Sequence, residues 1–187
     1  MALTKLKPCK GRLLISEPFL NEPYFKRSVI LLAEHNEEGS IGFILNKPID
    51  IKLTRAIPDF PEYKGTLFLG GPVSKNQLFF IHTLGSKIEG SIEIMKDLFL
   101  GGNINELKKM ITKKEIKSSD FRFFAGYSGW GPEQLNNELK AKSWIVTDAT
   151  REQIMDENTI RLWGNVLKTM GNEYAMMANF PENPSLN

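Results

Sequence analysis

The sequence predicts an α+β fold in a single domain, residues 1–187. Segments rich in Val, Ile and Leu come first along the chain and are joined by short turns, whereas most helical patterns come later. A doubly wound parallel sheet would instead alternate strands with helices throughout. A chain of 187 residues is long enough for one well-buried core and short for two domains.

The earliest strands are predicted at residues 13–16 and 28–34, where apolar and β-branched residues dominate. The polar stretch 35–39 predicts a turn, and residues 41–46 predict the returning strand of a hairpin. Pro48 ends that strand, because proline has no N–H to donate to a ladder.

The middle of the chain predicts short elements. Residues 53–57 predict one helical turn that stops before Pro58. Strands are predicted around the glycine turn that follows and beyond it, at 66–69, 77–83 and 91–95. Asn103 predicts the N-cap of a helix, with Glu106 three residues later completing a capping box.

The most informative segment is Gly126-Tyr127-Ser128-Gly129-Trp130-Gly131-Pro132. The apolar run 121–125 before it predicts a strand, and Pro132 predicts the first position of a short helix. Glycines permit a sharp turn between the two. Such a junction would bring backbone N–H groups and two aromatic rings to one point, where an anion or a ligand could bind.

The last third of the chain predicts a strand at 144–146, a short helix at 150–156 and a longer helix at 160–170. The longer helix has Gly171 as its C-terminal cap. Its apolar face, which we expect to be buried, contains Ile160, Trp163, Val166, Leu167 and Met170.

The Gly126 segment, with Gln134, Leu135 and Glu138 after it, resembles the G-Y-[SA]-G-W-x-x-x-Q-L-x-x-E motif of the YqgE/AlgH family. Further blocks match in the family's order: Gly11 to Ser16, Pro23 to His35, Asn46-Lys47-Pro48, Gly70-Gly71-Pro72-Val73, and the ending Pro184-Ser185-Leu186-Asn187. The resemblance implies a bifurcated, partly barrel-like, mostly antiparallel sheet flanked by helices. The role that it implies is regulation of bacterial transcription rather than a defined reaction.

Composition narrows the function classes. Hydrophobic residues make up 41% and charged residues 25%, and the formal net charge of +2 does not demand a polyanionic partner. Apolar runs are too short to cross a bilayer or to serve as a signal peptide. A lone Cys9 excludes an intramolecular disulfide, and one cysteine with two histidines gives no metal-ligand spacing. We expect a cytoplasmic protein with no metal, no cofactor and no membrane partner.

The predicted binding surface joins three turns: Asn46-Lys47-Pro48, Gly70-Gly71 and Gly126 to Trp130. The glycine amides could cradle phosphate or carboxylate, Arg27 and Lys47 could supply positive charge, and Tyr127 and Trp130 could stack on a planar ring. Gln134 faces the last turn and bonds main-chain groups there. The partner would be an unidentified protein or small molecule. Alternatively, the glycines only permit close backbone approach and the aromatic rings fill the core.

Two other classes remain open. Ser128 at a strand-to-helix turn suggests a hydrolase nucleophile, with His35 or His82 as its base, but Trp130 is bulky for such a turn and the family motif accepts alanine at the Ser128 position. The lysine-rich helix after Asn103 could contact nucleic-acid phosphates, although no known DNA-reading or RNA-binding motif occurs. We therefore expect a protein that binds rather than catalyses.

Overall fold

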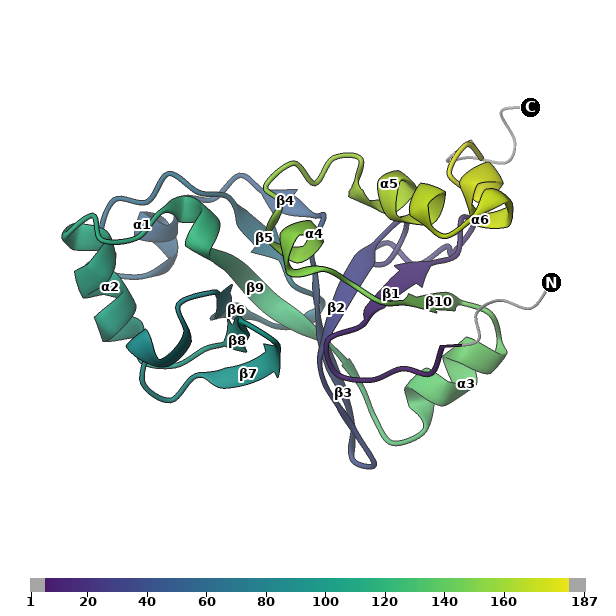
Figure 1. Ribbon diagram of the computed structural model, residues 1–187, viewed down its shortest axis with the longest axis horizontal. Helices are drawn as coiled ribbons and strands as arrows, with labels where there is room; N and C mark the ends of the chain where they lie inside the picture. The colour runs from purple at the N-terminus through teal and green to yellow at the C-terminus, as the bar shows by residue number, and fades with distance from the viewer. Residues whose placement is uncertain (1–5, 182–187) are drawn as a thin grey trace.

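The structure is a computed structural model that describes residues 6–181, so the ending Pro184-Ser185-Leu186-Asn187 lies outside the described residues (Figure 1). Within that range the strands are β1 Leu13–Ser16, β2 Val29–Asn36, β3 Gly39–Ile44, β4 Pro48–Ile49, β5 Leu67–Leu69, β6 Val73–His82, β7 Ile92–Met95, β8 Leu98–Leu100, β9 Phe121–Trp130 and β10 Trp144–Thr147. The α-helices are α1 Leu53–Ala56, α2 Ile104–Thr112, α3 Gln134–Lys140, α4 Arg151–Met155, α5 Leu162–Thr169 and α6 Asn172–Met177.

The strands form one branched sheet in the order β10-β1-β2-β3-β9-β6-β8-β7, with β5 also paired to β9 and β4 to β5. The β5–β9 pair is parallel, and the other pairs are antiparallel. In Figure 1, β1, β10, α3, α5 and α6 lie on one side (the first lobe), and β6–β8, α1 and α2 lie on the other (the second lobe). The α+β class and the mostly antiparallel, branched sheet are confirmed, but the sheet does not close into a barrel in the described residues.

The long strand β9 joins the two lobes. Its first half pairs with β5 and β6, and its second half, from Ser128 to Trp130, pairs with β3. The predicted glycine turn at 126–130 is therefore wrong, because this segment is strand. Gly126 adopts φ +69°, which bends the strand without ending it. The ladder to β3 then continues the strand up to Trp130.

Three apolar clusters fill the structure, and β9 contributes to each. Phe121 and Phe123 pack under α1 and α2 in the second lobe, and Phe124 lies in the large cluster that also contains residues of β1, β2 and α5. Trp130 belongs to a third cluster with Leu135 of α3. Because successive strand residues point to opposite faces, one bent strand can supply all three cores.

Several predicted boundaries are corrected by tertiary contacts. The helix expected from Pro132 begins at Gln134, because Glu133 takes the left-handed φ of +59°. The hairpin turn is tighter than predicted, since β2 extends to Asn36 and β3 starts at Gly39. Strand β8 and helix α6 were not predicted; Gly171, at φ +109°, ends α5 and directly precedes α6.

Two expected local arrangements also differ. Asn103 caps α2 by accepting from Asn105 N at 3.0 Å, but Glu106 Oε2 accepts from Glu89 N at 2.7 Å, so the predicted capping box does not form. The Glu106 carboxylate thus accepts from the main chain of the loop at Glu89 and not from the Asn103 N–H. Ile160 was expected to be buried, yet it precedes the start of α5 and is 87% exposed.

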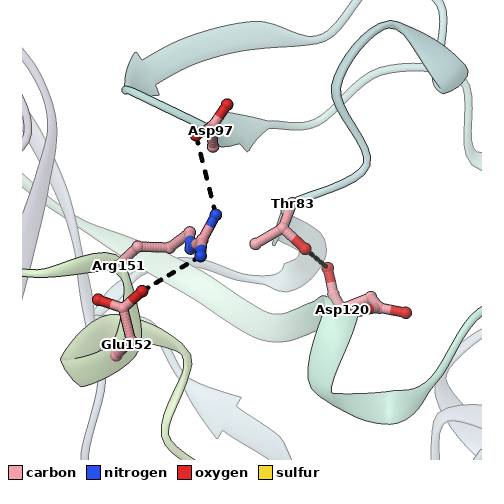
Figure 2. Close-up of polar contacts among 5 residues, drawn as sticks. All are labelled: Thr83, Asp97, Asp120, Arg151 and Glu152. Atoms are coloured by element: carbon pink, nitrogen blue, oxygen red, sulfur yellow. Dashed lines mark hydrogen bonds and ion pairs between the residues drawn. The ribbon is translucent and has the colours of Figure 1, made fainter.

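Helix α4 is held by a buried contact to β9 and by an exposed contact to the β7–β8 turn. Arg122 of β9 is 2% exposed, donates to Leu45 O at 2.6 Å and to Ile154 O of α4, and lies 4.1 Å from the centre of the Phe68 ring. Burial lowers the pKa of Arg122 to about 10. This value is still well above neutral pH, so the guanidinium stays charged. Figure 2 shows a second, exposed link: Arg151 of α4 reaches Asp97, between β7 and β8, at 3.8 Å.

Candidate functional site: a basic pocket beside α5

The glycines of the two predicted turns are held against neighbouring main chain. A Cβ on Gly70 would lie 2.2 Å from Gly126 O, and a Cβ on Gly71 would lie 2.2 Å from the carbonyl of Tyr127. Gly70 N donates to Ala125 O at 2.9 Å, and Ile44 N donates to Gly70 O at 2.9 Å. These glycines therefore allow three chain segments to meet at close range. Their use as an anion cradle stays a prediction.

The side chains of the Gly126 segment point into the protein. Ser128 is fully buried, and its hydroxyl donates to Gly70 O at 3.0 Å rather than pairing with a histidine. Trp130 is 5% exposed and donates from Nε1 to Glu138 Oε2 at 2.9 Å. Tyr127 is half-buried and meets the ring of Phe79 edge-on. An indole this buried is a core anchor and offers little surface to a partner.

Gln134 remains exposed, while Gly129 is exposed on the strand beside it. Gln134 Oε1 accepts from Gly131 N at 3.0 Å, and its Nε2 donates to Glu138 Oε1 at 3.0 Å. Its amide thus bonds main chain and side chain at the start of α3, as the sequence suggested. The contact fixes α3 against the end of β9.

The Asn46-Lys47-Pro48 turn lies next to the Gly70 turn. Lys47 O accepts from Leu69 N at 2.8 Å, and Pro48 pairs with Phe68 in the β4–β5 ladder. Asn46 closes the turn from the other side: its Oδ1 accepts from Val29 N at 2.9 Å and its Nδ2 donates to Arg27 O at 2.8 Å. The main chains of the three predicted turns are thus neighbours. Their side chains separate, and only Asn46 and Lys47 of them line the pocket described next.

This pocket lies between the strand ends at Arg27 and Asn46-Lys47 and one face of α5. It has a volume of about 420 Å³, and we call it the basic pocket. Its polar lining consists of Arg27, Asn46, Lys47, Arg161, Asn165 and Lys168. Four of these side chains are basic and none of the residues lining it is acidic. A hollow with this lining attracts anions.

Arg27 is the central cation of the basic pocket. Its guanidinium lies over the Trp163 ring, 4.8 Å from the ring centre, and donates from Nη2 to Phe180 O. Its Nε is buried and has no hydrogen-bond partner among the described residues. Its backbone takes a left-handed φ of +49°, held by the bond from Asn46. Within the described chain Arg122 Nε in the core also lacks a partner, so the orphaned donor of Arg27 favours a ligand site only because Arg27 also lines the basic pocket.

Helix α5 supplies the other charges through its spacing. Arg161, Gly164, Asn165 and Lys168 follow one another at three- and four-residue steps, so they share one face. The opposite, apolar face packs Trp163 and its neighbours into the core. The apolar face was predicted from the sequence, whereas the polar face was not. The spacing was readable, but nothing in the sequence indicated that Arg27 and Lys47 would lie opposite.

A larger hollow of about 690 Å³ lies beside β4 and β5. Its charged lining balances Asp50 and Glu62 against Lys52 and Lys64. Because opposite charges in one hollow cancel its field, it offers less to a charged ligand than the basic pocket does. In the described residues, no three His, Cys, Asp or Glu side chains come together as metal ligands.

The two histidines are held elsewhere. His35 Nδ1 lies 2.7 Å from Ser40 Oγ in the β2–β3 hairpin. His82 is fully buried, with Nε2 3.0 Å from Gly101 O and Nδ1 accepting from Leu84 N. Since Nδ1 accepts, Nε2 carries the proton of the neutral ring. Burial lowers the pKa of His82 below its usual value, while the bond to Gly101 opposes this.

Fold and site together define an α+β protein with a branched, open sheet and a cation-lined pocket beside its penultimate helix. A family model described as AlgH-like matches residues 13–175. A UPF0301 protein from Chlorobium limicola is 44% identical over 183 residues, covering 98% of this chain and 97% of that protein. A UPF0301 protein from Cytophaga hutchinsonii is 41% identical over 179 residues, with 95% and 98% covered. The chain belongs to the AlgH-like family.

Solved structures bear on the fold. A crystal structure of a Corynebacterium diphtheriae protein has a TM-score of 0.78 at 24% identity, and 96% of each chain is covered. The solution structure of AlgH from Pseudomonas aeruginosa has a TM-score of 0.71 at 24% identity, with 95% of this chain and 98% of that chain covered. Within residues 6–181, no helix is both long and apolar enough to cross a membrane.

Proposed function

We propose that this protein acts by binding, and that the basic pocket holds an anionic ligand or an anionic group of a partner. The observation that carries the proposal is the half-buried Arg27, with its unpartnered Nε, among further cations and no acid in the lining. A cytoplasmic location and a role in bacterial gene regulation, without direct reading of an operator, belong to the same proposal. Family resemblance supports the regulatory role.

Charge and geometry favour phosphate or carboxylate groups as ligands. Arg presents a planar set of donors that matches such groups, and partial burial of Arg27 reduces screening by water. The first turn of α5 contains no acidic residue, so its positive dipole end adds to the charge of Arg161. A pocket of this size admits a small dianion or one acidic group of a larger partner.

The geometry around Ser128 favours binding over hydrolysis. A serine nucleophile needs an accessible hydroxyl and a base within hydrogen-bond reach. The Ser128 hydroxyl is buried and donates to a main-chain carbonyl, and the strand continues where the nucleophile-elbow motif would require a turn into a helix. These observations support a protein without a catalytic serine.

The proposal is tested by calorimetric titration with pyrophosphate and citrate. Reversing two exposed pocket charges, in Arg161→Glu with Lys168→Glu, should weaken binding at least about tenfold, since each charge-assisted contact contributes about 1.5–3 kcal/mol. The matched control is Lys109→Glu with Lys113→Glu, which makes the same charge change on exposed lysines of α2 and its cap.

The control should bind both anions within about threefold of the original protein, because exposed charges beyond a Debye length are screened. Equal losses in the two variants would show diffuse attraction and contradict a pocket. Failure to detect binding of either pyrophosphate or citrate in the titration would also contradict the proposal. Binding of labelled DNA lost only in the α2 variant would instead support the nucleic-acid class.

A further inference from the structure

Exposed apolar side chains gather around the basic pocket. Ile160, which lines it, is 87% exposed. Phe19 and Phe180 stack on each other, with ring centres 5.6 Å apart, and are 46% and 39% exposed. Met176 of α6 is 58% exposed. Of the six large apolar side chains that are exposed within residues 6–181, Ile160, Phe19 and Phe180 are linked to the pocket by its lining, by the stacking and by the Arg27–Phe180 contact. Met176 lies on α6, which packs on α5. We call these four side chains the apolar rim.

The rim and the cations are parts of one surface. Arg27 donates to the carbonyl of Phe180, and Ala178, two residues earlier, lines the pocket. Ile160 directly precedes Arg161 at the start of α5. A ligand that enters the pocket with an acidic group therefore lies within reach of both the isoleucine and the aromatic pair. Exposed aromatic, Met and Arg side chains together are the composition of protein-binding surfaces.

We propose that the apolar rim and the basic pocket bind a segment of a partner protein in which a large apolar side chain is flanked by Asp or Glu carboxylates. The proposal rests on the proposed function and names the partner of the same pocket. Charge complementarity predicts that the partner segment is acidic, since the pocket is lined by four basic side chains and no acidic one. The apolar anchor covers the Phe19–Phe180 pair.

The shape of the surface favours a peptide segment over an anionic membrane. Arg27 lines a hollow and is half-buried against Trp163, which makes it less accessible to a flat layer of lipid headgroups than an exposed side chain is. A single carboxylate on a peptide side chain can enter. Compared with a small dianion, a peptide also covers the rim residues, which extend outside the pocket.

The test begins with selection of short random displayed peptides on the whole protein. We expect the selected peptides to share one Leu, Ile, Phe or Trp with acidic residues on both sides. Synthetic probes then separate the two parts: Asp-Glu-Leu-Phe-Asp-Glu, and the same peptide with Leu-Phe replaced by Ser-Ser. Fluorescence anisotropy should give at least about tenfold tighter binding for the first probe.

Matched variants locate the contact. Phe19→Ser should weaken the apolar probe about tenfold and leave pyrophosphate binding unchanged, because Phe19 carries no charge and does not line the pocket. Ile92→Ser changes an exposed isoleucine of β7 in the second lobe, 59% exposed, and should alter neither. Arg161→Glu should weaken both probes and pyrophosphate.

Specific outcomes overturn the inference. Equal affinity of the two probes would leave an anion site and remove the apolar partner segment, so the proposed function would stand alone. Failure of pyrophosphate to bind would remove the proposed function itself. Selection of peptides without acidic residues, failure to select any peptide, or Phe19-dependent binding to phosphatidylglycerol vesicles in place of peptides would each contradict a peptide partner.

Discussion

Arg27 and Ser128 both lie in sequence blocks that resemble the family's motifs, but their side chains have different surroundings. Ser128 is fully buried and satisfied by the carbonyl of Gly70. Arg27 is half-buried, left-handed in φ and unsatisfied at Nε within the described chain. The carbonyl of Gly70 accepts from the Ser128 hydroxyl, whereas Arg27 Nε has no acceptor among the described residues. At this scale Ser128 stabilises the fold, and Arg27 is the residue on which the proposed anion site depends.

Replacing Ser128 with alanine should lower the free energy of unfolding by about 1 kcal/mol, because one buried hydrogen bond is lost. Gly70 O keeps its bond from Ile44 N, so no carbonyl is left unpaired. Urea unfolding measures the change, and pyrophosphate titration should show unaltered affinity. Loss of ligand binding in a variant that stays folded would show that Ser128 has a role beyond packing.

His82 should make stability depend on pH in mildly acidic solution. Burial lowers its folded pKa, whereas in the unfolded chain it takes up a proton below about pH 6.5. The unfolded state then binds more protons, so the free energy of unfolding falls as the pH drops from about 6.5 to the folded pKa. In His82→Gln, which keeps a donor for Gly101 O, this part of the slope should disappear. Thermal unfolding between pH 5 and 7.5 checks it; an unchanged slope would contradict burial of a neutral ring.

Among the elements, β9 shows what a sequence pattern can and cannot indicate. Continuous apolar runs predicted β1, β2 and the first half of β9, because those stretches of strand bury both faces. Continuation past Gly126 depends on pairing with β3, far back in the chain, so the glycines were interpreted as a turn. The N-cap of α2 at Asn103 was predicted correctly, but the capping box predicted there does not form because Glu106 accepts from the distant Glu89 N. The start of α3 was missed because Glu133 is left-handed.

Gly126→Ala should destabilise the protein strongly. Its φ is +69°, and a Cβ would lie 2.6 Å from Val73 O, so the bend that carries β9 from one lobe to the other would have to open. Gly101→Ala is the matched control: its φ is +64°, but no atom lies within 4 Å of the added Cβ. The control should cost only the left-handed penalty of about 1–2 kcal/mol.

We expect Gly126→Ala to cost at least about 2 kcal/mol more than the control, measured by denaturant unfolding, since a main-chain clash adds to the same backbone penalty. Similar losses in the two variants would show that β9 tolerates a side chain at its bend. The close packing of the three chain segments would then be wrong.

On the scale of the whole molecule, a buried arginine of β9 and an exposed ion pair hold α4 in place. Arg122→Met would leave Leu45 O and Ile154 O without their donor, at about 1–3 kcal/mol for each buried carbonyl. Asp97→Asn removes only the exposed contact to Arg151 and should cost at most about 1 kcal/mol. Comparison of the two unfolding curves tests the assignment. A larger loss for Asp97→Asn would show that the exposed pair dominates.

The candidate site is a property of the whole molecule, which limits how much of it the sequence could indicate. Family motifs placed Asn46 and Lys47, and charge drew attention to Arg27. Arg161, Asn165 and Lys168 meet them only because α5 packs Trp163 beneath Arg27, with Trp163 Nε1 donating to Ser16 O of β1 at 2.9 Å. No periodicity in the sequence encodes that docking.

The central claim, that anions bind in the basic pocket, is tested most directly by mapping amide chemical shifts during titration with pyrophosphate. We predict that the largest changes fall on the amides of Arg27, Arg161 and Asn165, and that Arg161→Glu with Lys168→Glu abolishes them. Changes centred on Gly70, Gly71 and Gly126 would instead support the glycine turns, and changes along α2 would support its lysine face. Either of these two results would contradict the account.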